Sequence, residues 1–80
     1  MALRIKDNVD LKELERFEFI EEDGDYYYDF MKYSPFECSY LCITAQRTVL
    51  TEYVVYEHIT RMTDLIFDLI QAGLVEKIDD

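Results

Sequence analysis

The chain has 80 residues, a hydrophobic content of 50% and a net charge of −10, which comes from 18 carboxylates against 8 Lys and Arg residues. This hydrophobic content is too high for a disordered tail and is enough for one modest core, so we expect a single domain over residues 1–80. The sequence has no basic cluster. This excludes direct binding to nucleic acid and to anionic membrane surfaces, because both require a positive patch.

The sequence predicts neither a membrane span nor a targeting segment. No apolar run reaches the ~18 residues of a transmembrane helix, and residues 1–10 lack the apolar core of a signal peptide. We therefore expect the protein in the cytoplasm of the cell that makes it. Cys38 and Cys42 agree with this, because on one strand they would lie ~13 Å apart at ~3.3 Å per residue, too far for a disulfide. Both are expected as free thiols in a reducing compartment.

The first elements are a weakly predicted extended segment over residues 1–6 and a short helix over residues 11–16. Asp10 is placed to cap this helix, and Glu13, three residues later, is placed to reciprocate. Leu11 and Leu14 would share its apolar face.

Residues 17–31 predict a β-hairpin about Asp23-Gly24, a favoured two-residue turn. One face of this hairpin carries five aromatic residues, with Glu21 at its rim: Phe17, Phe19, Tyr26, Tyr28 and Phe30. A slip of one residue would scatter these rings over both faces, which favours this register. The other face carries three cross-strand pairs, two of them acidic: Glu18 opposite Asp29, Glu22 opposite Asp25, and Ile20 opposite Tyr27.

The second half of the chain predicts two more strands and a longer helix. Residues 40–45 and 49–56 are rich in β-formers and are expected to pair about Gln46-Arg47. An apolar stripe with helical period follows, with Thr60 as its expected cap and Gly73 as its end: Ile59, Met62, Leu65, Ile66, Leu69 and Ile70. A short final strand over residues 74–78 completes the prediction.

The predicted fold class is therefore α+β. We expect an antiparallel β-meander of about four strands, with the short N-terminal helix and the longer C-terminal helix packed on one face. The residues expected in the core are Phe19, Tyr28, Ile43, Leu50, Met62, Ile66 and Leu69.

The residue types that carry chemistry do not form a recognised set. His58 is the single histidine, and nothing in the sequence orients a Cys42–His58 pair, so a capping or surface role is the alternative. Two cysteines and one histidine are too few for a recognised zinc site, and Gly24 interrupts the acidic run where a calcium loop needs carboxylates. We expect no enzyme activity, no cofactor and no metal.

Two surface features are candidate binding sites. The acidic hairpin face places like charges directly across strands, which is destabilising. It is either a solvated face that discourages aggregation or a negative surface with an apolar centre that meets a basic partner. Phe67 lies away from the centre of the helical stripe. It is either covered by the N-terminal helix or is an anchor for a partner or a second copy.

Residues 6–17 and 64–77 resemble a family of small uncharacterised accessory proteins of phages and prophages of Gram-positive bacteria. The likeness covers about a third of the chain, at its two ends, and the middle departs from the family. This family has no assigned activity, so no functional residue is carried over. The resemblance implies a small accessory phage protein made inside a bacterial host cell.

Together these observations predict a non-catalytic module that binds the basic surface of a host or phage protein. A specific form is an acidic inhibitor that occupies a nucleic-acid groove, as many phage-encoded CRISPR inhibitors do. The alternative is a structural or self-associating phage component, for example a homodimer. Salt separates the two, because it weakens binding to a basic groove steeply and does not weaken hydrophobic self-assembly.

Overall fold

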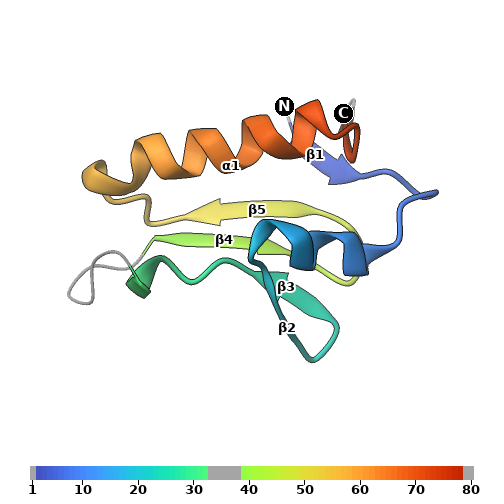
Figure 1. Ribbon diagram of the computed structural model, residues 1–80, viewed down its shortest axis with the longest axis horizontal. Helices are drawn as coiled ribbons and strands as arrows, with labels where there is room; N and C mark the ends of the chain where they lie inside the picture. The colour runs from blue at the N-terminus through green and yellow to red at the C-terminus, as the bar shows by residue number, and fades with distance from the viewer. Residues whose placement is uncertain (1, 33–38, 79–80) are drawn as a thin grey trace.

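The computed structural model describes residues 2–32 and 39–78, and these form the α+β arrangement that the sequence predicts (Figure 1). Four antiparallel strands form a sheet in the order β2-β3-β4-β5, which confirms the meander. Their bounds are Ile20–Glu22, Asp25–Tyr27, Tyr40–Ile43 and Val49–Glu52. The long helix α1 covers Ile59–Gln71, and three short 3-10 helices complete the set: η1 (Leu11–Phe17), η2 (Phe30–Lys32) and η3 (Tyr56–His58).

A second, two-stranded sheet joins the two ends of the described chain. Strand β1 (Ala2–Ile5) pairs antiparallel with β6 (Val75–Ile78), so that Ala2 lies opposite Ile78. The Arg4 guanidinium reinforces this pairing through Glu76 at 2.9 Å and also binds Asp7 at 2.6 Å. A single bridge from Arg4 to Thr48 connects β1 to the neighbouring hairpin. The extended character of both segments was predicted, but their pairing was not.

The first hairpin confirms the predicted register close to its turn and corrects it further away. Ile20 lies opposite Tyr27, Glu21 opposite Tyr26, and Glu22 opposite Asp25. Asp23 and Gly24 both have positive φ, as a tight turn of this kind requires. Beyond Ile20 the predicted ladder is wrong, because η1 extends to Phe17 and Glu18 then adopts the left-handed conformation with φ 69°. Phe17 opposite Phe30, Glu18 opposite Asp29 and Phe19 opposite Tyr28 are therefore not ladder pairs.

One face of the four-stranded sheet, here called the inner face, forms the core together with the helices. Phe19, Tyr26, Tyr28 and Phe30 are all buried, and Phe17 packs against them. Phe19, Tyr28 and Phe30 stack edge to face, with centroid distances of 5.9 and 4.8 Å. Helix η1 adds Leu14 to the same cluster, and α1 adds Met62, Leu65 and Leu69.

Of the seven residues predicted in the core, five are buried: Phe19, Tyr28, Ile43, Met62 and Leu69. Ile66 is half-buried, and the prediction for Leu50 is wrong, since 40% of it is exposed. The register explains this, because Leu50 lies opposite Cys42 and successive residues of a strand point to opposite faces. Val49 takes the place on the inner side.

The ends of the helices agree with the sequence in part. Asp10 caps η1 by accepting a bond from the Lys12 N–H at 3.0 Å, but Glu13 pairs with Arg16 instead of reciprocating. The predicted cap at Thr60 is wrong, because η3 leads directly into α1 at Ile59. Gly73 ends α1 as predicted: its φ of 74° is left-handed, and the next N–H, of Leu74, donates to the Leu69 carbonyl.

Arg47 fixes the second hairpin and attaches the N-terminal segment to it. The loop is a turn closed by the Arg47 N–H on the Thr44 carbonyl, with Arg47 at φ 73°, a position that usually favours glycine. The hydrogen bonds of its side chain explain why arginine, and not glycine, occupies this position. Nη1 donates to the carbonyls of Lys6 and Val9 at 2.8 and 2.6 Å, and the Arg47 carbonyl accepts from the Ile5 N–H.

We predict that Arg47→Gly lowers the free energy of unfolding by about 2–4 kcal/mol, because two charge-assisted hydrogen bonds are lost. Glycine accommodates the positive φ better than arginine, so the loss would come from the side chain and not from backbone strain. The control is Arg16→Ala, which removes an exposed ion pair with Glu13 and should cost at most about 1 kcal/mol. Urea denaturation measures both, and a neutral or stabilising Arg47→Gly would contradict the role of the side chain.

The sheet register predicts a contrast between two leucines. Leu69→Ala should cost about 2–5 kcal/mol, because Leu69 is 1% exposed and its removal leaves a cavity. Leu50→Ala should cost less than about 1 kcal/mol in the isolated protein, because that side chain lies on the open face. Thermal melts followed by circular dichroism compare the two, and equal losses would show that the assigned faces are wrong.

Candidate functional site

The face of the four-stranded sheet opposite the core, here called the outer face, carries an apolar row that crosses all four strands. Ile20 lies opposite Tyr27, Tyr27 opposite Cys42, and Cys42 opposite Leu50. Paired residues of neighbouring strands point to the same side, so these four side chains form a continuous row. Ile20 and Leu50 are exposed at its two ends, while Cys42, in the middle, is buried. We call this set the outer row.

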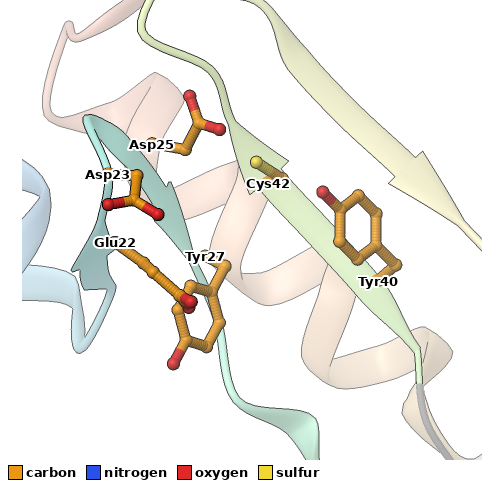
Figure 2. Close-up of a pocket in the computed structure, with 6 residues that line it drawn as sticks. All are labelled: Glu22, Asp23, Asp25, Tyr27, Tyr40 and Cys42. Carbon is orange, nitrogen blue, oxygen red and sulfur yellow. The ribbon is translucent and has the colours of Figure 1, made fainter.

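Acidic residues border the outer row on both sides. Glu22 and Asp25 form the next cross-strand pair toward the hairpin turn, where Asp23 adds a third carboxylate. On the other side Tyr40 lies opposite Glu52. In Figure 2, which looks onto this face with α1 behind the sheet, the acids and the two tyrosines surround a shallow hollow. Its volume is about 360 Å³, and it is lined by Glu22, Asp23, Asp25, Tyr27, Tyr40 and Cys42.

Backbone donors satisfy some of these carboxylates. The Ala45 N–H donates to Asp25 Oδ1 at 2.8 Å, which ties the first hairpin to the second. The Gly24 N–H donates to Glu21 Oε1 at 3.3 Å within the turn. Within the described part of the chain, the side chains of Glu22 and Asp23 make no hydrogen bond or ion pair. These two carboxylates are the negative charges of the hollow that remain available to a partner.

Tyr40 and Cys42 form the polar centre of the hollow. The Tyr40 hydroxyl points toward the Cys42 sulfur in Figure 2. A hydrogen bond to the Cys42 side chain and the electrostatic interaction with it, together with burial and the nearby carboxylates of Glu52 and Asp25, raise the pKa of Tyr40 to about 12. The phenol therefore stays protonated at neutral pH and acts as a hydrogen-bond donor. Cys42 is a free thiol, and Cys38, predicted to be one, lies outside the described residues.

The structure brings together four of the seven residues predicted for partner binding. Ile20, Glu22, Asp25 and Tyr27 share the outer face as predicted. Glu18 and Asp29 do not belong to it as a pair, because Glu18 ends η1 and Asp29 accepts the Met31 N–H at 3.0 Å at the start of η2. Sequence reasoning missed Tyr40, Cys42, Leu50 and Glu52. Alternation along residues 40–45 and 49–56 groups these four on one face, and the register of β3 with β4 identifies that face as the outer one.

Phe67 lies on α1, away from the outer face, and 55% of it is exposed. Of the two interpretations of Phe67, burial under the N-terminal helix is therefore wrong. That helix instead buries Leu14 in the core.

His58 does not pair with Cys42. Its Nδ1 lies 2.8 Å from Ser39 Oγ, which also accepts the Val55 N–H at 2.8 Å, and its ring stacks on Phe30. Both Ser39 and His58 are buried, and Nε2 has no partner among the described residues. The hydroxyl and the imidazole join the start of β4 to the segment before α1, a role in holding the fold.

In the described parts of the chain, no three His, Cys, Asp or Glu side chains converge as a metal site would require. None of the helices there is both long and apolar enough to cross a membrane. Comparison with known proteins finds no matching family model, no matching curated protein and no matching solved structure.

The contact between Tyr40 and Cys42 predicts the titration of the phenol. Absorbance at 295 nm, compared with Tyr40→Phe, should place the pKa of Tyr40 near 12, and Cys42→Ala should move it down toward the ordinary 10.0. Since the pKa is raised in the folded state, the stability linked to this group is fully present below about pH 10 and is lost as the pH rises toward 12. An unchanged midpoint in Cys42→Ala would contradict the contact.

Proposed function

We propose that this protein is a non-catalytic binding module whose outer face binds a basic segment of a protein partner inside the bacterial cell. The observation that carries the proposal is the apolar outer row with carboxylates on both sides. A sheet face that is exposed only to solvent has no physical reason to carry adjacent apolar side chains such as Ile20, Tyr27 and Leu50. Among the described residues that line the hollow there is no cation to neutralise its acids.

Lysine and arginine side chains match this surface. Each has an aliphatic stem that can lie on apolar side chains while its charged end reaches a carboxylate at the border. Tyr27 and Tyr40 also offer ring faces, which attract cations. A basic segment across the sheet would therefore bury its stems on the outer row and place its charges beside Glu22, Asp23 and Glu52.

Repulsion in the free protein supports the same proposal. Glu22 lies directly opposite Asp25, and like charges in such a pair cost some tenths of a kcal/mol. A basic partner would relieve that repulsion, so the arrangement favours the complex more than the isolated fold. The net charge of −10 would also attract a basic partner from a distance and speed its association.

A specific form of the proposal is an inhibitor that occupies the nucleic-acid groove of a host or phage protein. Such grooves hold Lys and Arg side chains that contact phosphates. Carboxylates held on a sheet can make charge-assisted hydrogen bonds to the same side chains. This role suits a small accessory protein made during phage infection.

The double variant Glu22→Gln, Asp23→Asn tests the binding face. We expect it to leave the fold intact, because neither side chain makes a hydrogen bond or ion pair to another described residue. Asparagine also tolerates the left-handed φ of 52° at position 23. Affinity for a peptide that alternates Lys or Arg with Leu should fall at least about tenfold, mainly through the association rate. Stopped-flow fluorescence of a labelled peptide measures both rates.

The matched control is the double variant Asp64→Asn, Asp68→Asn on α1. Like the hairpin variant, it removes two negative charges and changes the net charge from −10 by +2 to −8. It should weaken binding much less than the hairpin variant. Equal losses in the two variants would mean that net charge alone attracts the peptide. Wild-type affinity that stays constant from about 50 to about 500 mM salt would contradict an electrostatic site altogether.

Competition tests the inhibitor form. A nucleic-acid-binding protein captured from the bacterial host should lose its nucleic acid as this protein is added, and should keep it when the hairpin variant is added. A captured partner that keeps its nucleic acid in both cases would contradict the inhibitor form.

A further inference from the structure

Helix α1 carries two apolar seams, and the sheet covers one of them. Met62, Leu65 and Leu69 are buried against the core. The second seam consists of Ile59, Thr63, Ile66 and Ile70, flanked by Phe67. Ile59, Phe67 and Ile70 are 46%, 55% and 49% exposed, and Thr63 is exposed as well. Ile66 is half-buried against the core, so the second seam faces solvent over most of its length within the described structure. In Figure 1, α1 lies at the outside of the molecule, with the sheet on one side of it.

The spacing within the exposed seam is that of a helix pair. Its four positions are separated by four, three and four residues, which is the a/d repeat of a coiled coil. The order of these spacings is the same from either end of the helix. Two antiparallel copies of α1 related by a two-fold axis would therefore place Ile59 against Ile70 of the second copy, and Thr63 against Ile66 of the second copy.

Charge also selects a second copy as the occupant. With a net charge of −10, two copies repel each other wherever carboxylates would meet. The seam and Phe67 carry no charge, and the charged residues of α1 lie on another side of the helix at helical spacing: Arg61, Asp64 and Asp68. Two copies can approach along this seam without burying a carboxylate.

A shallow groove extends the seam toward the sheet. Ile66 lines it together with residues of β1 and β5: Ala2, Leu3, Val49, Leu50 and Thr51. None of these residues is charged, so the groove enlarges the neutral surface beside α1, and at the edge strand β5 it shares Leu50 with the outer row. A basic partner of the kind proposed for the outer face would find no carboxylate on this surface to pair with.

We propose that the protein forms an isologous dimer through antiparallel packing of α1, with Ile59, Thr63, Ile66 and Ile70 as the seam and Phe67 covering its side. The seam is about 16 Å long at 1.5 Å per residue, which places the interface at the small end of stable contacts. The dissociation constant is therefore expected in the micromolar range, about 1–100 µM. The acidic outer face, on the sheet, stays free in both copies.

Substitutions at Thr63 test the seam without touching the core, because this side chain is exposed in the single copy. Thr63→Leu fills the centre of the seam and should tighten the dimer at least about tenfold. Thr63→Lys buries a charge there and should weaken the dimer at least about 100-fold, although it makes the net charge less negative, from −10 to −9. Gln71→Lys, at an exposed position off the seam, makes the same charge change and should leave the dimer intact.

Sedimentation velocity from about 1 µM to about 1 mM measures the association, a range that brackets the expected constant. Circular dichroism melts confirm that each variant is folded. Raising salt from about 50 to about 500 mM should strengthen the dimer by screening the repulsion, whereas it weakens binding to the outer face. A wild type that is monomeric throughout, a dimer that survives Thr63→Lys, or equal loss in Gln71→Lys would each overturn the proposal.

Discussion

Tyr26, Tyr28, Leu41 and Ile43 must point to the same side of the sheet if so short a chain is to exclude water from a core. Strand geometry excludes a register shifted by one residue, because successive side chains alternate between faces and the slip would move one strand's set to the other side. Once β3 and β4 pair with these four residues on one side, Tyr27, Tyr40 and Cys42 are forced to the other side. The set of residues on the outer face is thus a direct consequence of filling the core. Filling the core does not require those positions to be apolar, so the outer row is a separate feature of the sequence.

The acidic hairpin shows how the fold tolerates its own charge. A ladder that places Glu22 opposite Asp25 would be costly if both carboxylates stayed unpaired. Asp25 instead accepts a hydrogen bond from the Ala45 N–H, and Glu21 accepts one from the Gly24 N–H, so two of the acids replace backbone partners that the turns lack. The remaining repulsion falls on Glu22 and Asp23 at the tip, where solvent screens it best.

Local signals in the sequence were sufficient for most of the elements but not for all of their neighbours. The strand predicted over residues 49–56 ends at Glu52, and the short helices η2 and η3 were not predicted. The Asp23-Gly24 turn, the buried aromatic residues and the stop at Gly73 follow from short stretches of chain, and the structure confirms them. The pairing of β1 with β6 joins residues at opposite ends of the sequence. Neither four-residue strand carries a sequence signal that identifies the strand with which it pairs. Glu18 was misplaced because η1 runs on to Phe17 and needs a left-handed residue to end it. Half of the outer face was missed because the order of the strands was predicted but the register of β3 against β4 was not, since that register depends on the intervening chain and not on a turn signal.

The pairing of Ala2 with Ile78 brings the two described ends of the chain side by side, as Figure 1 also shows. A short linker between them would close the chain with little entropy loss, since the ends are already neighbours. A circular permutant opened elsewhere would turn the most distant contact in the sequence into a local hairpin. Lower contact order generally speeds folding, so the order in which the sheets form would change while the native packing stayed the same.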